Sequence, residues 1–263
     1  MPIVSNKDIL SPRANILGVG VNPINIPIAL ESISSWIEQG DRHYVCVTGV
    51  HGIIESQRDV KLRSIHNKAG LVTPDGMPLV WLSRAQGFPG VERVYGPDLM
   101  LALCEYSQSR GFRHFLYGST PEVLFCLGDN LTKRYPQLKI VGTYAPPFRL
   151  LTKKEEQDEI QTINSTEPDI VWIGLSTPKQ ELWMDKNITR LNAKVLIGVG
   201  AAFDFHAGLK KQAPSWMQRN GLEWFFRLLT EPRRLWRRYF INNPTFLMLV
   251  LCQLSGIKKY SLE

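Results

Sequence analysis

The sequence is poor in the features that mark membrane-spanning, secreted and disulfide-linked proteins. Its longest late apolar run, residues 246–252, falls far short of the roughly 18 apolar residues that a membrane-spanning helix needs. The N-terminal segment shows no basic stretch followed by an apolar one, so no secretory signal is predicted. No pair among the four cysteines has C-x-x-C spacing, which argues against a zinc site or a redox motif. We therefore expect a protein of the reducing cytoplasm.

Signatures of metals and of common cofactors are missing as well. The chain has no G-x-G-x-x-G and no P-loop, so dinucleotide and NTPase sites are not indicated. It also has no D-x-D pattern of the kind that holds magnesium and a diphosphate in metal-dependent sugar transferases. His206 has no second ligand one helical turn further on, so a metal site there is rejected. We expect neither a metal nor a cofactor.

What is present fits a basic globular protein. The 263 residues suffice for one large α/β domain or for one domain with an appendage, and 44% of them are hydrophobic. Lysine and arginine number 31 against 24 acidic residues, a net charge of +7. This excess favours nucleotide phosphates, phospholipid headgroups or nucleic acid as partners, although a basic surface without such a partner explains it equally well.

Strand-like apolar runs alternate with amphipathic helical patterns. The predicted strands cover residues 44–48, 71–73, 114–117, 138–141, 169–173 and 194–197. The predicted helices cover residues 53–67, 97–109 and 152–163. This alternation predicts an α/β, Rossmann-like fold in which a mostly parallel sheet has helices on both faces.

Glycines follow several of these strands directly. In a parallel sheet, ligands bind beyond the carboxyl ends of the strands. Gly118, Gly174, Gly198 and Gly200 each come just after a predicted strand, and Ser119 continues the first of these loops. We therefore expect Gly118, Ser119, Gly174 and Gly200 to lie around one substrate site.

Two further loops carry polar candidates. Residues 177–181 open a helix whose N-terminal N–H groups can hold an anion. Lys179 there adds charge, and Gln180 can donate a hydrogen bond to a leaving oxygen or a sugar hydroxyl, although an ordinary capped helix start explains the segment as well. Asp204 follows the last strand, where it can hold ribose hydroxyls or a base edge.

Asp75 and Arg93 are the candidates for the reaction itself. Asp75 lies in a Pro-Asp-Gly turn after a strand, where its carboxylate can accept a proton from a hydroxyl. An aspartate at such a turn more commonly bonds to its own backbone. Arg93 precedes a Gly-Pro loop and can grip a diphosphate with two parallel hydrogen bonds, or form an ordinary surface ion pair with Asp98 or Glu92.

The amino-acid composition changes after about residue 208. Residues 209–240 interleave tryptophan and phenylalanine with many arginines, and Pro232 marks a helix start or a kink. We predict a catalytic core over 1–208 and a helical, Arg/Trp-rich appendage over 209–263. Three interpretations of the appendage stay open: binding of anionic lipid and diphosphate, binding of nucleic acid, or a packed helix with a solvated basic face. The clustered tryptophans favour a membrane surface.

Eight ordered blocks together resemble the WecG/TagA/CpsF family, also known as glycosyltransferase family 26. The blocks are VTGVHGI (47–53), LVTPDGMPLVW (71–81), ERVYGPDL (92–99), FLYGSTPEVL (115–124), PPFR (146–149), GLSTPKQELWM (174–184), GVGAAFDFHAG (198–208) and GLEWFFRLLTEPRRLWRRY (221–239). Eight blocks in order over most of the chain are more specific than any one motif.

The resemblance implies an activity. Members transfer N-acetylmannosamine, its acidic relatives or glucose from UDP-sugars to undecaprenyl-diphosphate-linked sugars, for teichoic acid, capsule or exopolysaccharide. The resemblance also implies that the transfer inverts the anomeric centre to give a β-linkage and that it needs no metal. The implied place is the cytoplasmic face of the plasma membrane, to which the enzyme binds peripherally. Membrane contact is expected to free the appendage, and a homo-oligomer is compatible with the family.

The resemblance also implies roles for individual residues. Asp75 matches the proposed catalytic base, and Arg93 and Gln180 match motif residues of the family's active site. The appendage residues expected to meet the diphosphate are Arg227, Arg234 and Arg237, with Arg233 and Arg238 as near alternatives.

The chain departs from the family at one motif. Thr48 and His51 match the T-N-V-H motif, but Gly49 stands where many members have asparagine. That difference indicates either a change of specificity or weakened activity. The rival hypothesis is therefore a non-catalytic nucleotide-sugar-binding or membrane-adaptor protein. Nucleic acid is not an expected partner, since nothing in the strand-end loops requires it.

Overall fold

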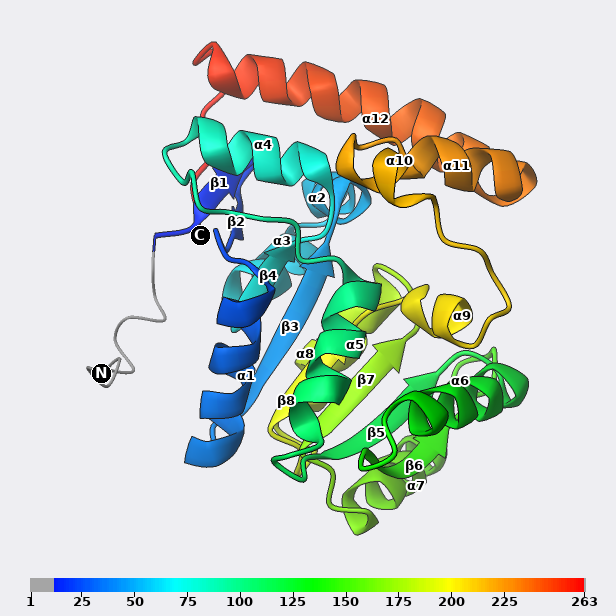
Figure 1. The fold of residues 1–263 in the computed structure, drawn as a ribbon. Coiled ribbons are helices and arrows are strands. Elements are labelled where there is room, and N and C mark those ends of the chain that lie inside the picture. The colour runs from blue at the N-terminus through cyan, green and yellow to red at the C-terminus, as the bar shows by residue number, and fades with distance from the viewer. Residues whose placement is uncertain (1–11, 263) are drawn as a thin grey trace. The chain divides into compact units, whose positions relative to one another are not determined.

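The computed structural model describes residues 12–262, and its contacts divide the chain into two compact units (Figure 1). Unit 1 consists of Met1–Ser32, Thr48–Val94 and Ala213–Glu263. Unit 2 consists of Ile33–Val47 and Tyr95–Gln212. Unit 1 is therefore built from three separate stretches of the chain, and unit 2 from two.

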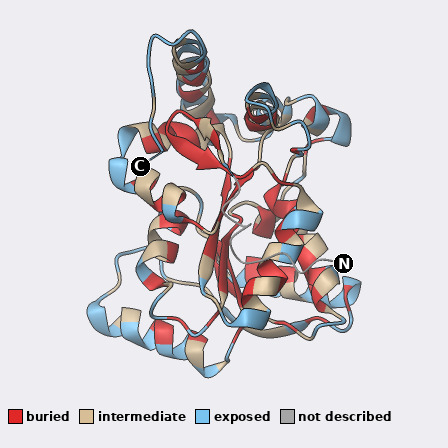
Figure 2. Ribbon diagram, turned by 90° about the vertical axis from the view of Figure 1, so that its left-hand side faces the viewer, coloured by how far each residue is buried: buried red, intermediate tan, exposed pale blue. Residues whose placement is uncertain are grey.

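Unit 2 is built on parallel strands in the order β3-β8-β7-β5-β6. The strands are β3 (His43–Thr48), β5 (Arg113–Gly118), β6 (Lys139–Tyr144), β7 (Ile170–Gly174) and β8 (Val195–Gly198). Their central members are continuous runs of buried residues, which is typical of parallel strands covered on both faces (Figure 2).

Helices connect and cover these strands. They are α5 (Gly96–Ser107), α6 (Pro121–Arg134), α7 (Lys153–Ser165), α8 (Lys179–Asn187) and α9 (Ala202–His206). In Figure 1, α5, α6 and α9 lie on one face of the unit 2 sheet, and α7 and α8 lie on the other. The predicted α/β fold, with a mostly parallel sheet between two helical layers, is confirmed.

Local sequence signals set several helix starts in unit 2. Thr120 caps α6 by accepting a hydrogen bond from the Val123 backbone N–H, and Pro121 takes the first helical position. Thr152 and Glu155 form a reciprocal capping box at the start of α7. These caps satisfy N–H groups that the first helical turn leaves without partners.

Unit 1 contains a small antiparallel hairpin, one further strand and most of the remaining helices. The strands are β1 (Ala14–Ile16), β2 (Val19–Val21) and β4 (Leu71–Pro74). The helices are α2 (Val50–Arg58), α3 (Val60–Lys68), α4 (Met77–Ala85), α10 (Ser215–Arg219), α11 (Glu223–Thr230) and α12 (Pro232–Leu254). A further helix, α1 (Ile26–Gln39), starts in this unit.

One predicted helix proves to be two. The sequence predicted a single helix over 53–67, whereas α2 ends at Arg58 and α3 begins at Val60. Asp59 separates them because its backbone is extended and its Oδ1 accepts hydrogen bonds from the N–H groups of Lys61 and Leu62. An aspartate in this position caps the second helix instead of continuing the first.

The C-terminal residues are integrated into unit 1. Helix α12 begins at Pro232, as one of the two predicted options, and packs against α2 and α11. Beyond its midpoint, Gln253 accepts a hydrogen bond from the Leu17 N–H at 2.9 Å and donates one to the Asn15 carbonyl at 2.8 Å. The predicted core boundary at 208 thus lies close to the unit boundary at 212, but residues 213–262 share their unit with 48–94.

Over residues 12–262, no helix combines the length and the apolar character that crossing a bilayer requires.

Candidate active site

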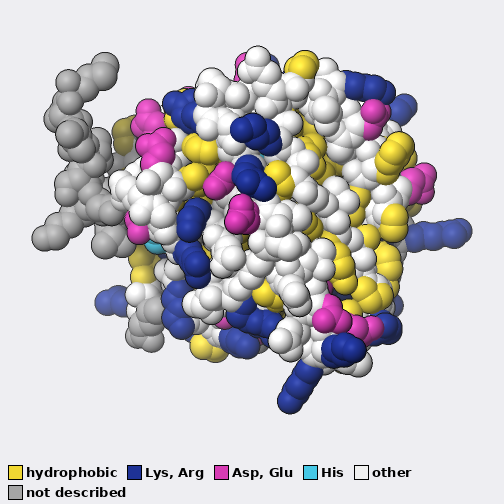
Figure 3. Space-filling view, turned by 90° about the horizontal axis from the view of Figure 1, so that it is seen from below, with side chains coloured by type: hydrophobic (Ala, Val, Ile, Leu, Met, Phe, Trp, Pro, Cys, Tyr) yellow, Lys and Arg dark blue, Asp and Glu magenta, His cyan; other side chains and the backbone are white. Residues whose placement is uncertain are grey.

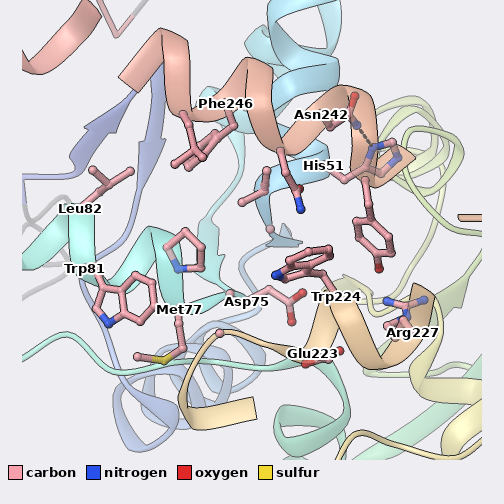
Figure 4. A pocket seen from close by; sticks show the side chains of 18 of the residues that line it. His51, Asp75, Met77, Trp81, Leu82, Glu223, Trp224, Arg227, Asn242 and Phe246 are labelled. Carbon is pink, nitrogen blue, oxygen red and sulfur yellow. Dashed lines mark hydrogen bonds between the residues drawn. The ribbon is translucent and has the colours of Figure 1, made fainter. Parts of the chain in front are cut away.

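The turn that follows β4 holds Asp75 in unit 1. The Asp75 backbone N–H donates to the Thr48 carbonyl at 3.0 Å, and the Val94 N–H donates to the Pro74 carbonyl at 3.0 Å. The turn is therefore fixed from two sides. Asp75 itself is half-buried, and in Figure 4 its carboxylate extends toward Trp224. A carboxylate on a fixed turn is suited to proton transfer, because it can be held in one orientation toward a reacting group.

A cavity of about 510 Å³ opens beside Asp75, and every residue that lines it belongs to unit 1. Its walls come from the start of α2, the β4–α4 turn, α4, α10, α11 and α12 (Figure 4). The charged and polar lining includes His51, Asp75, Arg93, Glu223, Arg227 and Arg238. The apolar lining includes Met77, Trp81, Leu82, Trp224, Phe246 and Leu247. One cavity thus offers a carboxylate, guanidinium groups and a broad apolar wall.

The apolar wall depends on Gly221. This residue has a φ of +70°, which residues with a side chain rarely adopt. A Cβ added here would lie 3.0 Å from the Trp81 ring and 3.4 Å from Met77. Glycine therefore lets the α10–α11 loop approach these two side chains closely.

All three guanidinium nitrogens of Arg93 contact protein groups. Its Nε donates to the Asp75 carbonyl at 2.7 Å, and its Nη1 donates to Gln218 at 3.0 Å. Its Nη2 forms an ion pair with Glu223 on α11, and only 14% and 16% of these two side chains are exposed. The sequence predicted a grip on diphosphate or a partner in Asp98 or Glu92. In the structure, Arg93 pairs with Glu223 in place of Asp98 or Glu92, and it joins the Asp75 turn to α10 and α11. Arg93 also lines the cavity, and its grip on a diphosphate stays a prediction.

Arg227 and Arg238 bring positive charge to the cavity. Burial lowers the pKa of Arg238, and the nearby charges of Arg227 and Arg234 lower it further. Burial raises the pKa of the neighbouring Tyr239 hydroxyl, against the effect of Arg227 and Arg238. Guanidinium groups that repel one another in a half-buried place gain stability from an anion, and a diphosphate matches their hydrogen-bonding geometry.

The other two predicted appendage arginines lie elsewhere. Arg234 is exposed and pairs with Glu231 at 2.7 Å. Arg237 is exposed, and its guanidinium carbon lies 5.3 Å from the centre of the Trp236 ring. Neither residue lines the cavity. Of the three arginines that were predicted to meet the diphosphate, only Arg227 lines the cavity. Arg238, which was predicted as a near alternative, also lines the cavity.

His51 and Gly49 lie at the start of α2, on the cavity wall. Asn242 of α12 bonds to the His51 ring, with its Nδ2 at 2.9 Å from Nδ1 (Figure 4). A Cβ added at Gly49 would be 3.5 Å from Oδ2 of Asp75, which is ordinary van der Waals contact. Thr48 is buried below them and supplies the carbonyl that fixes the Asp75 turn.

The strand-end glycines lie in unit 2, at the ends of neighbouring parallel strands. Gly118 and Gly174 are paired in the β5–β7 register, and Gly198 follows in β8 beside Ile173. A Cβ at Gly118 would lie 2.9 Å from the backbone of Gly174. The close packing of the two strands is therefore enough to explain why position 118 is a glycine. The loops continue through Ser119 and Gly200, which have φ values of 58° and 52°.

Gln180 is buried at the start of α8, next to these loops. Its Nε2 donates to Glu181 at 3.2 Å, and Thr177 donates to the same carboxylate oxygen at 2.8 Å. Among the described residues, none is a hydrogen-bond partner for Oε1 of Gln180. This oxygen lies 3.5 Å from a Cβ position at Gly200. Gln180 thus has its amide nitrogen bonded to Glu181 and its amide oxygen buried, and its role as a donor to substrate stays a prediction.

The remaining candidates of unit 2 are Lys179, Asp204 and His206. Lys179 is exposed at the start of α8. Asp204 forms an ion pair with Lys210 at 2.7 Å, and His206 bonds through Nε2 to the Pro97 carbonyl at 2.9 Å. Within residues 12–262, no group of three metal-binding side chains comes together. On the described part of the face in Figure 3, basic side chains are interspersed with acidic ones, as on an ordinary solvated surface.

Sequence reasoning missed several residues of this site. Glu223 and Gln218 bond to Arg93 from positions 130 and 125 residues away in the chain. Asn242 reaches His51 across 191 residues. Glu223 stands inside the GLEW block and was available as a candidate there, whereas no local signal distinguishes Asn242 from any other helical asparagine.

Known proteins match the chain over nearly its whole length. The family model described as "Glycosyl transferase WecG/TagA/CpsF family" matches residues 14–260. A protein of Bacillus subtilis (strain 168) is 29% identical over 247 residues, which are 90% of this chain and 93% of that protein. A Bacillus spizizenii (strain W23) protein is 28% identical over 218 residues, 83% of this chain and 82% of its own length. A Staphylococcus aureus (strain MRSA252) protein is 26% identical over 250 residues, 94% and 95% of the two chains.

All three relatives carry one name, N-acetylglucosaminyldiphosphoundecaprenol N-acetyl-beta-D-mannosaminyltransferase. The α/β unit with its crowded strand ends and the cavity lined by two carboxylates and three arginines agree with a sugar transferase. The chain belongs to the WecG/TagA/CpsF family of glycosyl transferases.

Proposed function

We propose that the chain transfers an N-acetylmannosamine-type sugar from a UDP-sugar to N-acetylglucosamine carried on undecaprenyl diphosphate. This is the reaction that the names of the three bacterial relatives describe, with UDP added as the donor's carrier. The product is an intermediate of a cell-envelope polymer.

One observation carries the proposal: Asp75, Arg227 and Arg238 line the same cavity as a wall of aromatic and aliphatic side chains. The proposed acceptor has the matching parts. Its diphosphate needs cations that donate several hydrogen bonds, its prenyl chain needs an apolar surface, and its sugar hydroxyl needs a base. We assign the acceptor to this cavity of unit 1.

In the proposed reaction, Asp75 takes the proton of the acceptor hydroxyl while that oxygen attacks the anomeric carbon of the donor sugar. The bond between this carbon and the UDP oxygen breaks, and UDP leaves with the electron pair. Attack from the face opposite UDP inverts the anomeric centre and gives a β-linkage. Help from a general base of this kind contributes roughly a hundredfold to ten-thousandfold in rate.

We assign the donor to the strand ends of unit 2. Gly118, Gly174 and Gly200 lie in or just beyond the ends of parallel strands, which is the usual ligand-binding edge of such a sheet. The buried Oε1 of Gln180 can accept a hydrogen bond from a ribose or sugar hydroxyl, and the first turn of α8 can hold a phosphate.

The C-terminal helices suit a membrane surface, where the acceptor resides. Exposed apolar side chains occur along α11 and α12, and they include Leu229, Trp236, Phe240, Leu247 and Leu251. Exposed Arg233 and Arg237 accompany them. Tryptophan beside arginine is favoured where acyl chains meet anionic headgroups. We propose peripheral binding to the cytoplasmic face of the plasma membrane.

The test is release of UDP from UDP-N-acetylmannosamine, UDP-N-acetylglucosamine, UDP-glucose and UDP-glucuronate, with and without a short-chain polyprenyl-diphosphate N-acetylglucosamine, and with and without EDTA. We expect acceptor-dependent release from UDP-N-acetylmannosamine that EDTA does not affect. Acceptor-dependent release from another donor would correct the sugar and keep the reaction. No release by folded protein that binds UDP would favour the rival, a non-catalytic binding protein.

A further inference from the structure

His51 contacts a buried side chain from the far end of the chain. Nδ2 of Asn242 lies 2.9 Å from Nδ1 of His51, and Nη2 of Arg58 donates to Oδ1 of the same asparagine at 2.9 Å. Asn242 is only 3% exposed. A short chain of hydrogen bonds therefore links Arg58, Asn242 and His51, and both His51 and Asn242 line the cavity.

The chemistry of these groups fixes where the proton of His51 lies. A guanidinium can only donate hydrogen bonds, so the amide atom that faces Arg58 must be the oxygen of Asn242. The amide nitrogen then faces His51, and this nitrogen can only donate. Nδ1 of His51 must accept, which requires that it carry no proton. A neutral imidazole with an unprotonated Nδ1 carries its proton on Nε2.

The carboxylate of Glu55 favours the opposite protonation state of the His51 ring. Its Oε1 lies 3.7 Å from Nδ1 of His51, and a carboxylate there favours a protonated ring. The same oxygen, however, accepts a hydrogen bond from Nη1 of Arg58 at 2.5 Å. Arg238 and Arg227 add positive charge to the cavity that His51 lines, and Arg238 also interacts with Glu55. These cations disfavour a positive charge on His51.

We propose that Asn242 is a positioning residue that holds His51 as the neutral tautomer with its proton on Nε2. His51 is then a hydrogen-bond donor toward an anionic oxygen, and it leaves the role of base to Asp75. The tautomer follows from the three side chains alone. The role toward a diphosphate oxygen rests on the proposed function.

NMR spectra of protein isotopically labelled at the histidine ring nitrogens test the tautomer without any substrate. The chain has five histidines, and the signals that disappear in His51→Gln belong to His51. We expect a bare nitrogen signal for Nδ1 and a protonated nitrogen signal for Nε2 at neutral pH. A protonated Nδ1 in the wild-type protein would overturn the proposal.

Two variants then test whether Asn242 is the cause. Asn242→Asp places an acceptor against Nδ1 and should move the proton there, and it should raise the pH at which the ring becomes charged. Arg58→Leu removes the donor that orients the amide; because Arg58 is half-exposed, we expect this variant to fold, and Nδ1 should become partly protonated. Asn192→Asp, on an exposed residue of unit 2, is the matched control with unchanged His51 signals. Unchanged signals in both Asn242→Asp and Arg58→Leu would also overturn the proposal.

Inorganic pyrophosphate probes the role toward an anion. We expect it to shift the Nε2 signal of His51 in the wild-type protein and to shift it at least tenfold less, at equal concentration, in folded Asn242→Asp. In the transfer assay, Asn242→Asp should raise the KM for the lipid-linked acceptor more than it lowers kcat. Failure of the proposed transferase function would appear as absence of UDP release in the wild type, with the tautomer signals unaffected. A pyrophosphate response that is identical in wild type and Asn242→Asp would refute the donor role.

Discussion

The guanidinium of Arg93 donates through Nε to the backbone carbonyl of Asp75 at 2.7 Å. The same side chain pairs with Glu223 at the start of α11. Arg93 thereby connects the turn of the proposed base with the helix that carries Arg227, and both Asp75 and Arg227 line the cavity. We therefore expect Arg93 to influence the proposed reaction through the Asp75 turn and α11, in addition to any contact with substrate.

From this geometry we predict that Glu223→Gln and Arg93→Met each lower the free energy of unfolding by about 1.5–3 kcal/mol, the range for hydrogen bonds to charged groups. The double variant should lose less than the sum of the two, because one interaction is removed in both cases. Urea unfolding of the four proteins measures this coupling. Strictly additive losses would show that the ion pair contributes nothing to stability.

The role of Asp75 as base predicts a separation of binding from turnover. Asp75→Asn retains the shape of the side chain but cannot take a proton, so turnover should fall by roughly a hundredfold to ten-thousandfold. UDP binding, measured by calorimetry, should stay nearly unchanged. An equal loss of UDP affinity and turnover would remove Asp75 from this role.

The positions of the arginines predict a ranking. Arg227→Gln and Arg238→Gln should each raise the KM for the lipid-linked acceptor at least tenfold, because both residues line the cavity. Arg234→Gln and Arg237→Gln should have smaller effects on this KM, because these side chains are exposed outside it. Steady-state kinetics with a detergent-soluble acceptor separates the cavity residues from those that act only at a membrane. The opposite ranking would support the assignment made from sequence.

The fold of unit 2 was predictable because its signals are local. Buried parallel strands consist of continuous apolar runs, and Gly118 and Gly174 end two of them in register. Thr152 and Glu155 form a capping box, a signal within four residues that marks the start of α7. The short strands β1 and β2 were missed, because three residues each are too few for a periodic pattern and because distant residues such as Gln253 hold them.

The site was predictable only in part, since its pairings are long-range. Asp75 and Arg93 were recognised as motif residues, but the partner of Arg93 lies 130 residues away. The choice between Arg237 and Arg238 depends on which side of α12 packs inward, and in the arginine-rich first turns of this helix nearly every side chain is polar or aromatic. Tertiary packing makes that choice, and the local sequence does not encode it.

A buried histidine in unit 2 predicts a specific dependence of stability on pH. Burial lowers the pKa of His114 from 6.5 to about 3, and its Nδ1 accepts a hydrogen bond from Trp172 at 2.9 Å. Between these two pKa values, the unfolded chain binds a proton that the folded chain does not. The contribution of this group is therefore complete above pH 6.5 and decreases as the pH falls below it, by about 1.4 kcal/mol per pH unit.

His114→Asn isolates this effect, because the asparagine Oδ1 can replace Nδ1 as the acceptor for Trp172 and does not titrate. The difference in free energy of unfolding between wild type and variant, measured with urea at several pH values, should shift in favour of the variant as the pH falls from 7 to 5. A difference that stays constant with pH would mean that His114 is protonated as readily in the folded protein as in the unfolded one.

Gly49 provides the most direct test of the motif at which the sequence predicted a departure from the family. Its φ of −109° is open to any residue, and a Cβ there would make ordinary contact with the Asp75 carboxylate at 3.5 Å. Gly49→Asn should therefore fold and gain about 0.4–1 kcal/mol of stability, because the substitution restricts the unfolded chain. Its amide can donate to Asp75 and hold the carboxylate in one orientation, so we expect faster turnover. Gly49→Asp, the matched control, places a second negative charge at the same point and should slow the reaction. If both variants fold and transfer sugar at the wild-type rate, the Gly49 position has no influence on the proposed base.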